Sequence, residues 1–105
     1  MSATQSVGFE IPETLVRLYK DMAVSPVMLL KNYALTYISG MIQKFDLENR
    51  SFEQKYHCTL PEFQARLDAM EDEEHFEWED DVMDWEFAVE NLRLWTQRKI
   101  ETEAE

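Results

Sequence analysis

The scarcity of chain-breaking residues constrains the fold of this sequence more than any other feature. Two glycines and three prolines are spread through 105 residues, and no stretch sustains the apolar–polar alternation of a half-buried strand. Apolar residues instead recur at intervals of three and four, the spacing that places side chains on one face of an α-helix. The sequence therefore predicts an all-α fold, a small helical bundle of about four helices.

The first two helix starts are expected from proline and capping residues. A helix can begin at Pro12, and Ser25-Pro26 matches an N-cap followed by proline at the first helical position. Residues 27–45 are the most apolar part of the chain, but polar residues interrupt them, so we do not expect a membrane span. Two apolar stripes in this segment predict a long apolar central helix. This helix would lie in the core or would also form the interface of an intertwined homodimer.

Two further helices complete the expected bundle. Thr59 and Glu62 have the spacing of a capping box, which would start a short helix. The last helix should begin near Phe76, where a seam of apolar residues steps by four and three. The seam consists of Trp78, Val82, Trp85, Val89 and Leu92. We expect one helical domain over residues 1–105, with residues 1–10 and 101–105 as frayed tails.

The charge of the chain is strongly negative and unevenly placed. The formal net charge is −12, eleven acidic residues lie within positions 71–90, and no Lys or Arg occurs between Arg66 and Arg93. Such a charge repels nucleic acids and anionic lipid surfaces and attracts cationic partners. Direct nucleic-acid binding is therefore not expected. The single cysteine and the lack of a signal-peptide pattern favour a soluble cytoplasmic protein.

The acidic tract contains carboxylate pairs with the spacing of a metal site, such as Glu77 and Asp80. All-α nucleotide pyrophosphohydrolases, however, draw such carboxylates from two facing helices, and a phosphate substrate also needs basic residues. Glu71, His75 and Glu79 step by four and Asp72 precedes His75 by three, which is half of a carboxylate-bridged di-iron pattern without its second half. We therefore expect no catalytic residue, no metal and no cofactor.

Two other motifs have ordinary structural interpretations that we favour. His57 and Cys58 suggest a nucleophile and its base, but neighbours at a helix end rarely reach each other, so Cys58 is interpreted as a small buried hydrophobe. Residues 52–67 have the outline of a helix-turn-helix, yet Glu62 and Asp68 stand where a recognition helix would meet DNA. An ordinary helical hairpin is the favoured interpretation of this segment.

The same segment carries a resemblance to a known family. The pattern FxxKYxxTxxxFxxxL runs from Phe52 to Leu67 and is followed by the tryptophan-rich acidic stretch EWEDDVMDWE. Over about residues 45–95 it resembles the small acidic all-α antitoxin-like proteins of prokaryotic toxin–antitoxin pairs. The resemblance implies neutralisation of a toxic partner, often a basic ribonuclease, by direct masking. The family's glycine after the tyrosine is replaced here by His57.

These observations lead to the hypothesis of a non-catalytic protein-interaction module, an acidic antitoxin or inhibitor that binds and masks a small basic protein. Aromatic side chains would supply the desolvated contact, and the acids around them would steer association. The predicted partner-binding residues are Glu74, Glu77, Trp78, Asp81, Asp84 and Trp85. The alternatives are a homo-oligomeric structural or regulatory helical protein and a divalent-metal-dependent all-α nucleotide phosphohydrolase.

Overall fold

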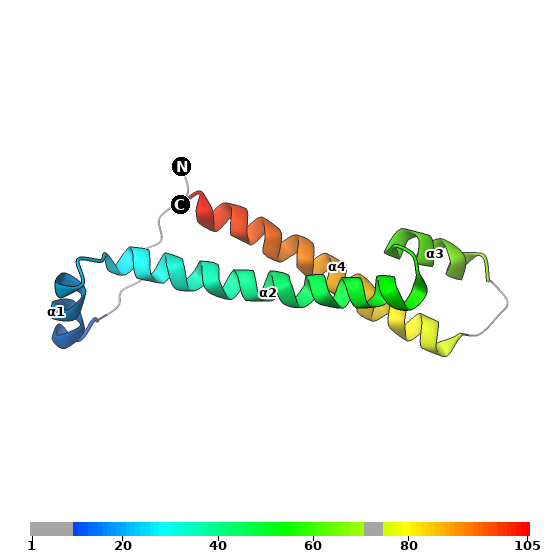
Figure 1. Ribbon diagram of the computed structural model, residues 1–105, viewed down its shortest axis with the longest axis horizontal. Helices are drawn as coiled ribbons and strands as arrows, with labels where there is room; N and C mark the ends of the chain where they lie inside the picture. Colours follow the sequence, from blue (N-terminus) through cyan, green and yellow to red (C-terminus); the bar gives the residue numbers. More distant parts are fainter. Residues whose placement is uncertain (1–9, 71–74) are drawn as a thin grey trace. The chain divides into compact units, whose positions relative to one another are not determined.

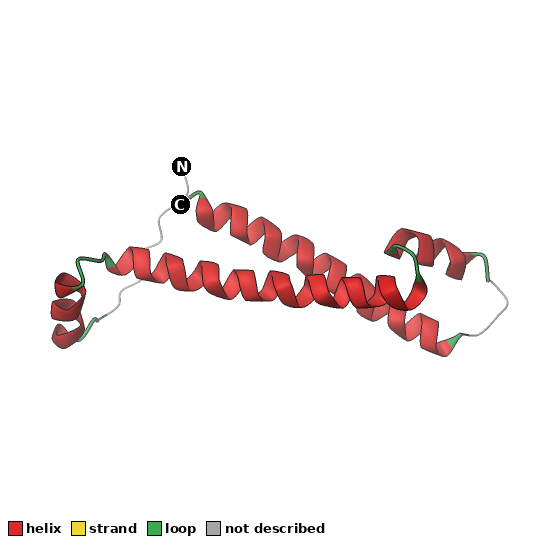
Figure 2. Ribbon diagram, in the orientation of Figure 1, coloured by secondary structure: helices red, strands yellow, loops and turns green. Residues whose placement is uncertain are grey.

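The computed structural model describes residues 10–70 and 75–105, and these form four α-helices and no strand (Figures 1 and 2). The helices are α1 (Glu13–Asp21), α2 (Pro26–Tyr56), α3 (Leu60–Asp68) and α4 (Phe76–Glu103). The prediction of an all-α fold with about four helices is confirmed. Within the described ranges, no helix combines the length and the apolar character needed to cross a membrane.

The chain divides into two compact units, Met1–Asn32 and Tyr33–Glu105. The first unit contains α1 and the start of α2, and the second contains the rest of α2 together with α3 and α4. The prediction of one domain over residues 1–105 remains a prediction, and each unit is described below by itself.

In the first unit, α1 ends in a Schellman turn and α2 begins with a side-chain cap. The N–H of Ala23 donates to the carbonyl of Lys20 at 3.1 Å, and that of Val24 donates to Tyr19 at 3.2 Å. This turn holds Ala23 at a φ of 53°, a left-handed conformation that glycine usually occupies. The hydroxyl of Ser25 then accepts from the N–H of Met28 at 3.2 Å, so the predicted N-cap of the second helix is confirmed.

The prediction of a long apolar central helix is wrong. α2 is 31 residues long, but its buried side chains are Ile38 and Phe45, while large apolar side chains in its first half are 54–74% exposed. These exposed residues are Val27, Met28, Leu30, Tyr33 and Tyr37. The physical reason is that a single neighbouring helix covers one stripe of α2, so the second apolar stripe stays at the surface.

The turn between α2 and α3 differs from the predicted capping box. The hydroxyl of Thr59 donates to the carboxylate of Glu62 at 3.0 Å and makes no cap hydrogen bond to a backbone N–H. A hydrogen bond to an ionised carboxylate is stronger than one between neutral groups, which favours this alternative. His57 adopts a φ of 55°, and Arg66 of α3 donates to the carbonyl of Tyr56 at 3.3 Å, so an α3 side chain caps the end of α2.

In the second unit, α4 runs antiparallel to α2 (Figure 1). Ring contacts join Tyr37 to Trp95, Phe45 to Phe87 and Tyr56 to Trp78, with centroids 5.7–6.0 Å apart. α4 begins at Phe76, as predicted, and continues to Glu103, so residues 101–103 are helical rather than frayed. The other expected tail, residues 1–10, lies outside the described residues except for its last position.

The core of the second unit lies where α3 covers the junction of α2 and α4. Phe63 and Trp85 are fully buried there, next to Cys58. Partly buried apolar side chains surround these three: Phe52, Tyr56, Leu60, Leu67, Trp78, Val82 and Val89. The predicted seam of the last helix is therefore the side of α4 that meets this core.

Candidate partner-binding surface

Two of the predicted partner-binding acids lie in an ion-pair cluster that fastens α4 to the end of α2. Lys55 Nζ lies 2.9 Å from Glu77 Oε1 and 2.6 Å from Asp81 Oδ2, and the Tyr56 hydroxyl donates a short hydrogen bond to the same Asp81 oxygen. Asp81 is mostly covered, with 18% of its side chain exposed, whereas Glu77 is open to solvent. Asp81 therefore serves the contact between two helices of its own chain.

The pKa values in this cluster follow from its geometry. Burial raises the pKa of Tyr56 to about 12, with the hydrogen bond to Asp81 adding to the effect. Burial also disfavours the charge of Asp81, but the hydrogen bonds from Lys55 and Tyr56 outweigh it and hold the pKa of Asp81 below its ordinary value of 3.8. Hydrogen bonds to Asp81 and Glu77 raise the pKa of Lys55. The cluster is thus charged at neutral pH, and the ammonium group of Lys55 offsets one of its two carboxylate charges.

The two tryptophans predicted to anchor a partner lie in the core. Trp85 is fully buried, it stacks on Phe52 and Tyr56, and its indole Nε1 donates to Asn49 Oδ1 at 2.7 Å. Trp78 is half-buried against Tyr56, and the ring of His75 stacks on it at 4.8 Å. In this structure Trp85 is inaccessible to a partner, because its ring has no exposed surface.

The remaining predicted acids have different positions. Asp84 is exposed and lines a shallow pocket of about 410 Å³ between α2 and α4, together with Glu48, Ser51, Phe52 and Phe87. Glu74 lies outside the described residues, as do Glu71 and the other acids of 71–74. The structure therefore brings Glu77, Asp81 and Trp78 together around Lys55 and Tyr56, and leaves Asp84 on the surface.

A stripe of exposed residues on α4, whose last member Phe87 also contacts Phe45 of α2, was not among the predicted residues. Phe76, Met83 and Phe87 are 60–70% exposed, and Asp80 continues the same spacing of four, three and four. We call these four residues the outer face of α4. Further exposed carboxylates flank it: Glu79, Asp84, Glu86 and Glu90. The signal in the sequence was that Met83 and Phe87 do not fit the seam that begins at Trp78.

The structure also shows where the residues of the other candidate sites lie. Among the described residues, no three His, Cys, Asp or Glu side chains converge as metal ligands would. Cys58 is buried in the core, whereas His57 is exposed in the turn. On α3, Gln64 donates to Glu86 and Arg66 caps α2, so the polar and basic side chains of the helix that would have met DNA both bind groups of their own chain.

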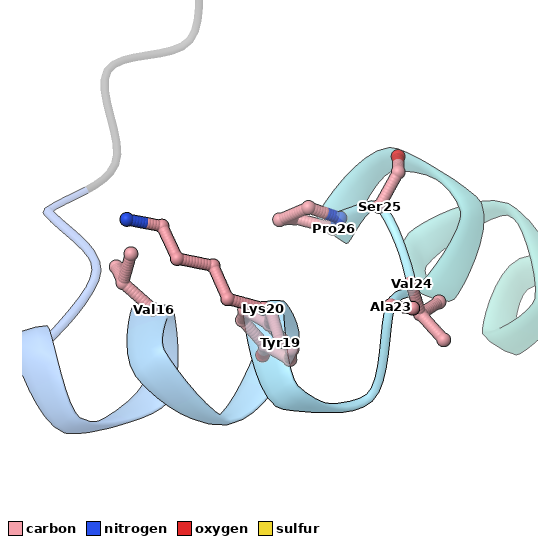
Figure 3. A pocket seen from close by; sticks show the side chains of 7 residues that line it. All are labelled: Val16, Tyr19, Lys20, Ala23, Val24, Ser25 and Pro26. Atoms are coloured by element: carbon pink, nitrogen blue, oxygen red, sulfur yellow. The ribbon is translucent and has the colours of Figure 1, made fainter.

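A second surface feature lies in the first unit. A pocket of about 300 Å³ is lined by the last turn of α1, the Schellman turn and the first residues of α2 (Figure 3). Its walls include Val16, Tyr19, Val24 and Pro26, and Lys20 is the charged residue among those that line it. Such a mainly apolar lining supplies few of the convergent polar groups that fix a small ligand.

Comparisons of the chain with protein-family models, with curated proteins and with solved structures find no match. The candidate surface is therefore interpreted from its own geometry and charge.

Proposed function

We propose that this protein is a non-catalytic interaction module that binds and masks a small basic protein through the outer face of α4. The observation that carries the proposal is the exposure of Phe76 and Met83, and of the part of Phe87 not covered by Phe45, on the helix whose seam packs into the core. Large apolar side chains at the surface, close together and rimmed by charge, are typical of protein-binding sites.

The charge around this face supports a cationic partner. Asp80 lies within the apolar stripe and Glu79 and Asp84 flank it, while residues 67–92 contain no Lys or Arg. Carboxylates at the rim of an interface accelerate the encounter with a basic protein and disfavour acidic partners. The resemblance to antitoxin-like proteins supports the same function, in which the bound partner is a toxin that the contact masks.

The metal-dependent phosphohydrolase alternative gains no support from the acidic start of α4. The group that faces Asp81 and Glu77 from α2 is the ammonium of Lys55, not a second pair of carboxylates. A divalent cation placed there would have to displace the ammonium group that already contacts both carboxylates.

The proposal is tested by affinity capture with matched charge variants. In the first variant Glu79→Gln, Asp80→Asn and Asp84→Asn neutralise the outer face, and in the second Glu101→Gln, Glu103→Gln and Glu105→Gln neutralise the carboxyl end. Both variants reduce the net negative charge by three, from −12 to −9. The tagged proteins are exposed to host extract at low and at high salt, and bound proteins are identified by mass spectrometry.

The expected result is a small basic protein in stoichiometric amount on the wild type at low salt. High salt should release it, the first variant should lose it, and the second should retain it. Equal loss from both variants would show an effect of net charge rather than of this face, and would overturn the assignment. The absence of any basic protein at either salt would overturn the proposed function.

A further inference from the structure

The acidic charge of the chain is confined to its second half. Residues 1–56 contain six acids and six bases, whereas residues 57–105 contain sixteen acids and four bases. The whole net charge of −12 therefore belongs to the part that follows α2. A basic partner has no electrostatic reason to choose α2, although α2 exposes several large apolar side chains.

One stripe of α2 within the second unit combines exposed apolar side chains with a glycine. Tyr33 and Leu47 are 74% and 56% exposed, and Gly40 stands midway between them. The three positions are seven residues apart, so they lie on one face of the helix. We call Tyr33, Gly40 and Leu47 the outer face of α2. The buried side chains of α2, Ile38 and Phe45, lie on the other side.

No contact within its own chain explains why position 40 is a glycine. A glycine in the middle of a helix costs about 1 kcal/mol relative to alanine. Apart from the adjacent residues and the backbone of α2 itself, no atom of the described residues lies within 4 Å of the Cβ that alanine would add there, so neither close packing nor a positive φ requires glycine. A helix that crosses α2 at Gly40 would use the missing side chain, because small residues allow helix axes to approach closely.

We propose that the outer face of α2 is a homodimer interface in which α2 packs antiparallel on α2 of a second copy, with the two-fold axis at Gly40. The stripe is symmetric about this residue, since a large apolar side chain stands seven residues before it and another seven residues after it. A two-fold axis at Gly40 places Tyr33 opposite Leu47 of the second copy, and Leu47 opposite its Tyr33.

The charges of α2 are compatible with this pairing. In the same register Lys44 faces Thr36 of the second copy, and Asp46 faces its Ala34, so neither charge meets its like. Residues 33–47 contain one base and one acid, and Asp46 is also paired with Arg50 at 3.1 Å. A second copy therefore meets no net charge on α2, whereas like charges would repel if the two acidic halves paired.

The first test is the mass of the full chain in solution, measured by light scattering after size exclusion over a range of concentrations. The wild type is expected at twice the chain mass. Gly40→Glu places two carboxylates and their bulk at the axis and should weaken the dimer about 100-fold or more. Ser39→Glu adds the same charge at the neighbouring exposed position of the same helix, away from the interface, and should leave the dimer intact.

Circular dichroism distinguishes dissociation from misfolding. Gly40→Glu has open space around it in the monomer, so helix content should be retained. A wild-type chain that remains monomeric at all concentrations would overturn the proposal. A dimer that Gly40→Glu and Ser39→Glu affect equally would overturn it as well.

A charge-pair experiment tests the antiparallel register. Tyr33→Glu and Leu47→Lys should each weaken the dimer, and the double variant should recover it, because each new carboxylate would face the new ammonium of the other copy. Within one chain the two positions are about 21 Å apart along the helix, so no intrachain ion pair can account for recovery. A double variant no more dimeric than the single ones would exclude this register.

Discussion

The outer faces of α2 and α4 differ in the feature that determines what can bind them. Both expose large apolar side chains, but residues 33–47 of α2 contain one base and one acid, whereas residues 76–90 of α4 contain seven acids and no base. Apolar exposure indicates that a face associates with something, and the charge around it determines the kind of partner. The comparison therefore separates self-association through α2 from the binding of a basic protein through α4.

A second contrast concerns the two ends of the chain. The first unit has no buried side chain among its described residues, whereas the second builds its core around Phe63 and Trp85. Burial of apolar surface is the dominant stabilising contribution, so the stability of the monomer should reside in the second unit. Both outer faces belong to the second unit, so the part of the chain that contains the core presents them both.

The largest expected effect is on the free energy of unfolding, and it tests the contrast between the two units. Trp85→Ala should lower the free energy of unfolding by about 3 to 5 kcal/mol, because it leaves a large cavity and removes the donor to Asn49. Leu18→Ala on α1, where Leu18 is 48% exposed, should change it by less than about 0.5 kcal/mol. Both are measured by urea denaturation in the Gly40→Glu background, so that self-association does not contribute. Similar losses in the two variants would contradict a core confined to the second unit.

An intermediate effect is expected at the ion-pair cluster. Asp81→Asn should cost about 1 to 2 kcal/mol at neutral pH, because it weakens the hydrogen bonds from Tyr56 and Lys55. Since the pKa of Asp81 is lowered in the folded state, its contribution is present above the ordinary value of 3.8 and is lost as the pH falls through the lower folded value. The difference between wild type and variant should therefore disappear in that acidic range.

The control for this prediction is Asp84→Asn, which removes the same charge from an exposed position on the same helix. It should have little effect on stability at any pH. If Asp84→Asn destabilised the protein as much as Asp81→Asn, the carboxylates of α4 would act through their summed charge and not through the contact with Lys55.

The smallest effect is stabilising. His57→Gly should raise the free energy of unfolding by about 1 kcal/mol, because it relieves the left-handed conformation of a non-glycine residue. Thermal unfolding monitored by circular dichroism measures the change, and Gln54→Gly within α2 should instead destabilise the helix. A loss of stability in His57→Gly would mean that the imidazole makes a contact more valuable than the relief of strain.

The sequence predicted where helices begin far better than it predicted which side chains are buried. The starts of α2 and α4 at Pro26 and Phe76 depend on nearby residues, and both were predicted. The position of Trp85 depends on Asn49, 36 residues earlier, and that of Asp81 on Lys55, 26 residues earlier. Such long-range pairs leave no local signal, so residues of the core were assigned to a surface.

The opposite error applies to Phe76 and Met83, which helical spacing separates from the seam but which nothing local marks as exposed. The sequence leaves a similar choice open for the apolar residues of 27–45. Their pattern fits a helix buried in the core and a helix that packs on a second copy of the chain equally well. Which of the two applies depends on how many neighbours the rest of the chain supplies.

The burial of Cys58 makes the opening of α3 measurable. This thiol is the chain's single cysteine and lies in the core beside Phe63 of α3 and Trp85 of α4. Because Cys58 is only 9% exposed, we expect a thiol reagent to react with it mainly while α3 is detached, and the rate of alkylation should follow how often that helix opens. Each opening also uncovers the aromatic rings beneath α3. The wild-type protein thus reports, through its own thiol, how often α3 detaches from the core.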